Sequence, residues 1–185
     1  MVVACASIFS LAVGSFAFPT VMGVDGRMHQ PIKDAGGKPI AFLFISHDCP
    51  VCNTYAPEIG RLIARFNGTV KFDLVYCDVK LTAGEARNHA KQFDLDGATL
   101  LLDPKCSIAA FCKATVTPQA VVFDERAKRV YSGRIDDRYL ALGQQRSATT
   151  SHDLAKALDA VLAHQSPKAA SGPAVGCYIV FPNPT

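Results

Sequence analysis

The sequence predicts an α/β fold: a three-layer sandwich in which a central mixed β-sheet carries helices on both faces. Two observations indicate this class. In the first part of the chain, segments typical of strands alternate with segments typical of helices, a pattern that favours parallel pairing. Later, two strand-like segments follow each other across a short turn, so that the sheet should end antiparallel.

The most clearly marked elements are one core strand and the helix after it. Residues 39–46 form a short, continuously apolar segment, which is typical of a strand buried on both faces. A helix is expected over residues 50–67, where apolar residues recur at helical spacing. Asp48 is a suitable N-cap, Pro50 suits the first turn, and Pro57 should kink the helix.

The other elements complete the alternation. A hairpin is expected over residues 21–31, because the turn-forming pair Asp25-Gly26 lies between two apolar segments. Further strands are expected at residues 70–77, 100–102, 119–124 and 129–135. Further helices are expected at residues 82–93, 104–113 and 151–164.

The length of 185 residues fits one domain with some residues to spare. We expect this domain over residues 21–165. An apolar segment, residues 1–20, precedes it. Residues 166–185 follow it and are rich in Pro, Ser, Ala and Gly, so we expect a loose tail.

The apolar segment resembles the core of an export signal, and Ser15-Phe16-Ala17 has the small-x-small pattern of a cleavage site. The first cationic residue is Arg27, so the basic start of such a signal is missing and we interpret the segment as truncated. We therefore expect an extracytoplasmic protein, in the bacterial periplasm or secreted, that meets a membrane only through this signal or anchor. A cytoplasmic location is the alternative.

The charge of the chain excludes one class of partner. The formal net charge is +3 and the Lys and Arg residues are scattered, so there is no basic stripe that would bind nucleic acid. We expect a monomer. The seven cysteines are an odd number, so at least one thiol is unpaired or pairs outside the chain.

The strongest functional signal is the pair Cys49 and Cys52, which follows a buried strand and opens a helix. A helix N-terminus offers unpaired N–H groups and a partial positive charge, and both favour a thiolate at Cys49. The thiolate is the nucleophile that attacks a disulfide. Cys52 lies about one turn further on and can resolve the mixed disulfide. We expect the Cys49 sulfur to be partly exposed and Cys52 to keep the higher pKa.

Two neighbours should modulate this pair in opposite directions. The Asp48 carboxylate would oppose a thiolate at Cys49, whereas a protonated His47 would favour one. Their relative weight stays open.

Other roles for the pair are a zinc half-site, inert buried cysteines or a static disulfide. Cys106 and Cys112, with five residues between them, have poor spacing to complete a zinc site, so we expect no metal and no cofactor.

Three segments resemble the thioredoxin-like superfamily. The sequence Cys-Pro-Val-Cys-Asn-Thr-Tyr-Ala-Pro at residues 49–57 resembles the thioredoxin active-site helix. The sequence Thr-Pro-Gln-Ala-Val-Val-Phe at residues 117–123 resembles the cis-proline loop and the strand after it, and Gly133 matches a glycine of the last strand. Residues 133–139 and 174–178 look like bacterial redoxin-domain proteins of the alkyl hydroperoxide reductase/thiol-specific antioxidant and thiol–disulfide interchange branch.

The resemblance implies a thioredoxin-like fold and a thiol–disulfide oxidoreductase that acts on protein or small-molecule disulfides with a redox partner protein. It implies a cis Thr117–Pro118 bond beside the dithiol. It also places Thr117, Pro118, Pro50 and Val51 at the substrate-binding surface.

Three departures from these families stand out. Leu43 occupies the position of the buried acid of thioredoxins, and Asp48 that of their tryptophan. Peroxiredoxins resemble Pro-x-x-x-Thr/Ser-x-x-Cys; Ser46 and Cys49 fit, but Phe42 stands in place of the proline. A thiol peroxidase, an antioxidant enzyme in which Cys52 resolves a sulfenic acid on Cys49, is therefore the second hypothesis. A redox-silent binding module is the third.

The remaining cysteines have open roles. Cys77 should lie inert in a core strand, and Cys106 and Cys112 could pair if the chain turns between them. Cys177 lies in the expected loose tail, either as a free thiol or as a partner that modulates the dithiol.

Overall fold

The structure is a computed structural model that describes residues 18–170 and 172–182. The predicted cleavage pattern and nearly all of the predicted export segment fall on residues 1–17, outside the described part. Within that part, no helix combines the length and the apolar character that crossing a membrane would need.

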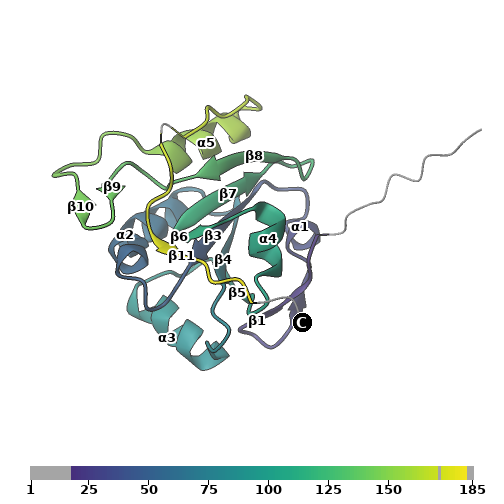
Figure 1. Cartoon of the computed structure of the whole chain (residues 1–185). Coiled ribbons are helices and arrows are strands. Elements are labelled where there is room, and N and C mark those ends of the chain that lie inside the picture. The colour runs from purple at the N-terminus through teal and green to yellow at the C-terminus, as the bar shows by residue number, and fades with distance from the viewer. Residues whose placement is uncertain (1–17, 171, 183–185) are drawn as a thin grey trace, which may run out of the picture.

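A mixed seven-stranded sheet forms the centre of the molecule, in the order β2-β1-β5-β4-β3-β7-β8 (Figure 1). Strand β3 pairs in parallel with β4, and β4 in parallel with β5; the other pairs are antiparallel. The strands are β1 (Val21–Gly23), β2 (Met28–His29), β3 (Ile40–Ile45), β4 (Lys71–Tyr76), β5 (Thr99–Leu102), β7 (Gln119–Phe123) and β8 (Arg129–Gly133). The predicted mixed sheet is confirmed.

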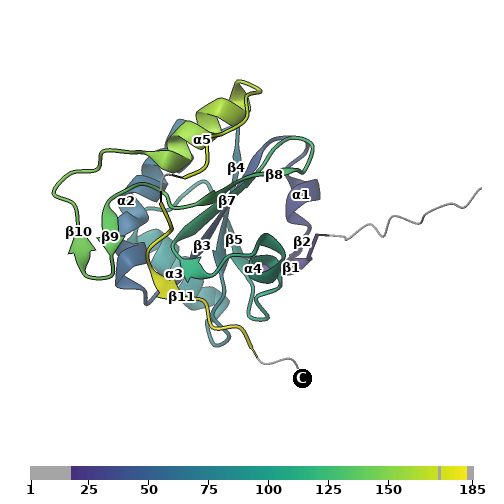
Figure 2. The ribbon, with the colours of Figure 1, turned by 45° about the horizontal axis from the view of Figure 1, so that its top comes forward.

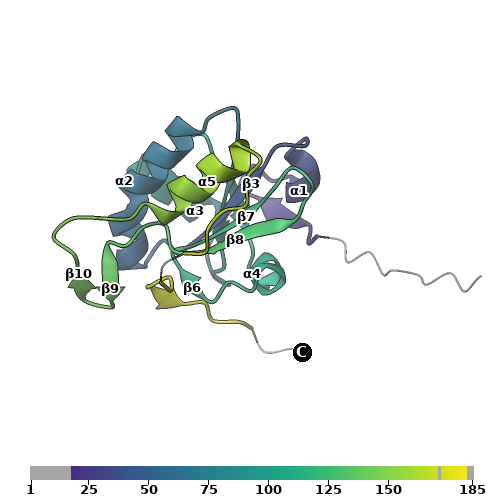
Figure 3. The ribbon, with the colours of Figure 1, turned by 90° about the horizontal axis from the view of Figure 1, so that it is seen from above.

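Helices cover both faces of this sheet, which makes the predicted three layers. Figure 3 shows α2 and α5 on one side and α4 on the other. The helices are α1 (Pro31–Asp34), α2 (Pro50–Arg65), α3 (Ala83–Gln92), α4 (Ser107–Cys112) and α5 (Asp153–Leu162). Two hydrophobic clusters fill the spaces between layers: one contains residues of α2, α3 and α5, and the other residues of α4.

The central strand β3 shows why a continuous apolar segment predicts a buried strand. Its alternate residues Leu43 and Ile45 belong to the cluster under α2, while Phe42 and Phe44 belong to the cluster under α4. Every residue of β3 is buried. Side chains alternate between the faces of a strand, so a strand covered on both faces needs apolar residues throughout.

Several elements differ from the sequence prediction. The segment after β2 forms the one-turn helix α1, because Pro31 stands at its first position and cannot donate to a strand ladder. Two short pairs were not predicted: β9 (Tyr139–Ala141) with β10 (Gln144–Gln145), and β6 (Val116–Thr117) with β11 (Cys177–Tyr178). Two-residue strands are too short for a pattern of alternation to reveal.

The C-terminal segment is more ordered than the predicted loose tail. Strand β11 pairs antiparallel with β6, which precedes β7, and Cys177 is opposite Thr117 in the register. Figure 1 shows this segment, in yellow, running back across the molecule to the neighbourhood of β6, and Figure 2 shows the same return from another side. The segment therefore reaches the carboxyl end of β3, where the active-site motif begins.

Candidate functional site

The site begins where β3 ends and α2 starts. Cys49 is the N-cap residue, with extended backbone, and Pro50 is the first residue of the helix. The sequence placed the cap at Asp48 instead. The Asp48 carboxylate accepts a hydrogen bond from the Ser46 hydroxyl and does not cap the helix. Cys49 thus lies closer to the unpaired N–H groups of α2 than the prediction assumed.

Three sulfur atoms converge at this end of α2. The Cys49 Sγ lies 2.6 Å from the Cys177 Sγ and 3.4 Å from the carbonyl oxygen of Thr117. The Cys52 thiol also hydrogen-bonds to Cys49. On its other side the Cys52 Sγ accepts from the Ser46 backbone N–H at 3.5 Å. The predicted dithiol therefore has a third thiol as its neighbour.

Both sulfurs of the dithiol are buried. The exposed fractions of Cys49 and Cys52 are 1% and 2%, whereas Cys177 is partly exposed. The expectation that Cys49 would be partly exposed is wrong, because β11 lies across it. The outermost of the three sulfurs belongs to Cys177.

The surroundings move the pKa values of the three thiols apart. The hydrogen bond from the Cys52 thiol, followed by that from Cys177, lowers the pKa of Cys49 to about 4 against the opposing effect of burial. Burial raises the pKa of Cys52 well above its usual value, and the hydrogen bond to Cys49 adds to it. Burial and the contact with Cys49 raise the pKa of Cys177 to about 11. At neutral pH the negative charge therefore rests on Cys49.

The loop before β7 brings the second predicted motif to the dithiol. The Thr117–Pro118 peptide bond is cis. Both residues are buried, and the Thr117 carbonyl faces the Cys49 sulfur. Of the two helix residues assigned to the substrate surface, Pro50 is exposed, whereas Val51 is buried in the cluster under α2, as Thr117 and Pro118 are buried in their loop.

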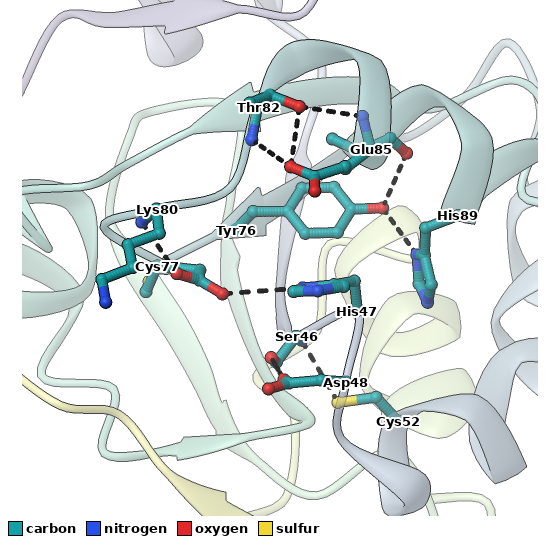
Figure 4. A network of polar contacts seen from close by, with 12 residues as sticks. Ser46, His47, Asp48, Cys52, Tyr76, Cys77, Lys80, Thr82, Glu85 and His89 are labelled. Atoms are coloured by element: carbon teal, nitrogen blue, oxygen red, sulfur yellow. Dashed lines mark hydrogen bonds and ion pairs between the residues drawn. The ribbon is translucent and has the colours of Figure 1, made fainter.

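His47 and Asp48, two of the three predicted modulators, lie beside acidic or polar neighbours (Figure 4), and the third, Cys177, contacts Cys49. The His47 Nδ1 lies 3.6 Å from an Asp78 carboxylate oxygen, and Asp48 is hydrogen-bonded to Ser46. Ligand atoms of His47, Asp48 and Asp78 are close enough to hold an ion. The His47 Nδ1 is buried and has no hydrogen-bond partner among the described residues. Neither His47 nor Asp48 is among the main causes of the lowered pKa of Cys49, but the Asp48 charge adds to the raised pKa of Cys177.

A hydrogen-bonded chain that the sequence did not reveal ties α3 to the active-site helix. The His89 ring joins the Tyr76 hydroxyl (2.9 Å) to the Asn53 side-chain oxygen (3.0 Å). Thr82 and Glu85 form a capping box at the start of α3, which fixes this helix (Figure 4). These contacts position α2 through Asn53, the residue next to Cys52.

A cavity of about 400 Å³ opens beside the three sulfurs. Its lining includes Cys49, Cys177 and Thr117 together with Cys77, Asp78 and Lys80. The cavity is large enough for a small disulfide.

A second group of thiols lies on the other face of the sheet. Cys77, Cys106 and Cys112 belong to or pack against the cluster under α4, and the Cys106 Sγ lies 3.6 Å from the Cys77 carbonyl oxygen. Burial is the main cause that raises the pKa of each of the three, to about 12 for Cys112. All three are free thiols, so the candidate pair Cys106–Cys112 is not formed in this structure.

No known protein family's sequence profile matches this chain, and no curated protein sequence does either. Solved structures do match. One is a hypothetical protein, SMc02350, from Sinorhizobium meliloti: the TM-score is 0.77 at 21% identity, over 89% of this chain and 91% of the other. An uncharacterized conserved protein from Geobacillus kaustophilus gives 0.75 at 21% identity, over 91% and 92%.

A smaller match connects this fold with known chemistry. It is to a secreted disulfide oxidoreductase of Mycobacterium tuberculosis, described as homologous to the Escherichia coli protein DsbE. The TM-score is 0.53 at 22% identity, over 61% of this chain and 81% of the other. At such identities the likeness concerns the fold. The chain therefore has the fold of the thioredoxin-like superfamily, as the resemblance of its motifs implied.

Proposed function

We propose that this protein is a thiol–disulfide oxidoreductase of the redoxin type, in which Cys49 is the nucleophile and Cys52 the resolving thiol. The observation that carries the proposal is the placement of two cysteines one helical turn apart: Cys49 stands at the N-cap of α2 against the cis Thr117–Pro118 loop, and the Cys52 thiol hydrogen-bonds to it. The pKa of Cys49 is lowered and that of Cys52 is raised, which favours a thiolate at Cys49 and a thiol at Cys52. Attack on a disulfide needs the first, and resolution needs a second thiol in reserve.

The reaction consists of two exchange steps. The Cys49 thiolate attacks one sulfur of a substrate disulfide, and the other sulfur leaves as a thiolate. This bond neutralises the charge at Cys49, which is one of the causes that raise the pKa of Cys52. Cys52 then loses its proton, attacks the Cys49 sulfur and releases the second substrate thiolate. The protein ends with a Cys49–Cys52 disulfide and the substrate fully reduced; the reverse sequence oxidises a dithiol.

Partners and location extend this proposal. The substrates are protein or small-molecule disulfides, and a redox partner protein returns the dithiol to its starting state. The protein works as a monomer outside the cytoplasm. The predicted export segment supports this location, and so does the description of one structural neighbour as secreted.

The test is the turnover of disulfide exchange with a protein disulfide and with a small aromatic disulfide. Cys49→Ser should lose the activity by a factor of at least about 10³, because the attacking thiolate is gone. Cys112→Ala, which removes a buried thiol on the other face of the sheet, is the matched control and should keep it. Full activity in Cys49→Ser would rule the proposal out and favour a redox-silent binding module.

A thiol peroxidase is the second candidate, because a thiolate at Cys49 is also what a peroxide would oxidise. Ser46, which fits the peroxiredoxin pattern, donates its hydroxyl hydrogen bond to Asp48 and not to the Cys49 sulfur. Stopped-flow measurement of peroxide loss separates the two activities. Fast peroxide loss that depends on Cys49, without disulfide exchange, would favour the peroxidase.

A further inference from the structure

Strand β11 occupies the edge that an extended substrate would use. Cys177 and Tyr178 pair antiparallel with Thr117 and Val116, and the Ile179 N–H donates to the Thr115 carbonyl at 2.9 Å. Strand addition at an exposed edge is a general way in which folds bind peptides. Here the chain supplies the added strand itself, so a peptide cannot pair with β6 while β11 is in place.

The strand approaches the active-site loop so closely that only glycine fits at one position. A Cβ atom added to Gly176 would overlap the backbone of Thr117 and lie 3.0 Å from the Pro118 nitrogen. Side chains then alternate along the strand. Tyr178 is exposed, Ile179 is anchored in the core under α4, and Cys177 meets the Cys49 sulfur at 2.6 Å. The contact between the two sulfurs therefore follows from the register of β11.

Cys177 also controls access to the dithiol. Cys49 is 1% exposed beside β11, and the partly exposed Cys177 contacts its sulfur and lines the same cavity. A disulfide has an S–S bond of 2.03–2.05 Å. The two sulfurs need to move only a fraction of an ångström to bond.

We propose that Cys177 is a third redox-active thiol, which β11 places against the Cys49 sulfur and which forms a disulfide with Cys49 during turnover. This inference rests on the proposed oxidoreductase function and adds a residue to its cycle. Strand β11 pairs with β6 in the way that an extended substrate peptide would.

The exchange steps balance without a further oxidant, because the substrate disulfide supplies the oxidising equivalent. Cys49 attacks the substrate, forming a mixed disulfide and releasing one substrate thiolate. Cys177 loses its proton to solvent and attacks the Cys49 sulfur, which releases the second substrate thiolate and leaves a Cys49–Cys177 disulfide. Cys52 then loses its proton, attacks the Cys49 sulfur and releases the Cys177 thiolate, which takes up a proton. One substrate disulfide has been reduced and one protein disulfide formed.

The test uses the reduced full-length chain in a Cys52→Ala background with one equivalent of 5,5′-dithiobis(2-nitrobenzoate). The proposal predicts that both halves of the reagent leave as coloured thiolates, and that peptide mapping finds Cys49 joined to Cys177. In Cys52→Ala/Cys177→Ala only one half should leave, with the other retained on Cys49. Cys52→Ala/Cys112→Ala is the matched control and should behave like Cys52→Ala.

A stable mixed disulfide on Cys49 in the Cys52→Ala protein, equal to that of the Cys177 double variant, would overturn the proposal. This outcome is distinct from failure of the oxidoreductase function, in which Cys49→Ser would exchange disulfides as well as the unchanged protein does. The two ideas therefore fail on different variants.

Gly176→Ala in the Cys52→Ala background tests the placement by β11. The added methyl group should displace the strand, so release of the second thiolate should slow by at least about tenfold, since proximity drives this step. Gly84→Ala is the control, because a Cβ there has its nearest neighbour, the Thr82 hydroxyl oxygen, at 3.9 Å. An unchanged second step in Gly176→Ala would contradict the assigned role of β11.

Discussion

The two groups of cysteines lie on opposite faces of the same sheet and differ in reactivity for a physical reason. Cys49, Cys52 and Cys177 meet at the start of α2, where thiols donate to one another and one of them becomes a thiolate. In the other group, near α4, the hydrogen bond from Cys77 also lowers the pKa of Cys106, but burial outweighs it, and the pKa of each of the three thiols is raised. The direction of the pKa shift therefore depends on whether hydrogen-bond donors to the sulfur outweigh burial, as they do at Cys49 and do not at Cys106.

The largest expected difference is the site of attachment of a small disulfide reagent. In the reduced native protein at about pH 6 the reagent should attach only within the first group, because the raised pKa of each thiol of the second group keeps it protonated. Peptide mapping by mass spectrometry identifies the labelled residue. In denaturant the two groups should label alike. If Cys112 in the native protein were labelled as fast as the first group, the two groups would not differ in reactivity and the account would be wrong.

Replacing Cys52 should have the next largest effect, on the pKa of Cys49. The Cys52 thiol is the main cause that lowers this pKa to about 4. Cys52→Ala should therefore move it upward, toward the ordinary value of about 8.5. The ultraviolet absorbance of the thiolate, titrated against pH, follows this change. An unchanged titration would mean that the helix N-terminus, not the neighbouring thiol, stabilises the anion.

The second group offers a test of stability. Asp103 is buried, and its two carboxylate oxygens accept hydrogen bonds from the Ser107, Ile108 and Ala109 N–H groups at the start of α4. Asp103→Ala should lower the free energy of unfolding by about 1–3 kcal/mol, because these buried donors lose their acceptor. Denaturant unfolding measures this loss. Glu125→Ala, at an exposed turn, should leave the stability nearly unchanged.

Removing the same carboxylate should barely alter the reactivity of the second group. Asp103 raises the pKa of Cys77 and Cys106, but burial is the larger cause for both. Both thiols should therefore stay protonated at neutral pH in Asp103→Ala. If either gained a thiolate there, the charge of Asp103 would outweigh burial.

The smallest expected effect concerns Cys177. The hydrogen bond from Cys177 lowers the pKa of Cys49 less than the hydrogen bond from Cys52 does. Cys177→Ala should accordingly raise this pKa by less than Cys52→Ala, in the same thiolate titration. A larger shift from Cys177→Ala would reverse the ranking of the two donors.

The sequence predicted the parts of this site that depend on local patterns. The apolar segment before Cys49 predicted strand β3, and the helical spacing of apolar residues after it predicted helix α2. The dithiol was therefore expected at the start of a helix. The cis bond at Thr117–Pro118 was expected from a resemblance of motifs, and the structure has it. Each of these features is encoded by residues that are neighbours in the sequence.

What the sequence did not predict depends on contacts between distant segments. Cys177 was expected as a free thiol, a partner for another cysteine or a modulator, but its contact with Cys49 across 128 residues was not predicted, because a two-residue strand has no periodicity that the sequence could show. Gly176 was the one available signal, since a glycine before a cysteine in an otherwise extended segment is consistent with close backbone approach. The same pairing of β11 with β6 buries Cys49. The unpredicted pairing therefore explains both the unpredicted Cys49–Cys177 contact and the wrong expectation of an exposed Cys49.

The most direct test of the contrast between the two groups is the thiolate titration of the fully reduced protein. A folded pKa of about 4 at Cys49 predicts one thiolate per chain already present at about pH 6, far below the ordinary range of a cysteine. The sign follows from the lowered pKa: the anion persists as the pH falls and is lost only as the pH passes through about 4. Cys49→Ser should lack this signal and Cys112→Ala should keep it. Absence of any thiolate below about pH 8 in the unchanged protein would contradict the account.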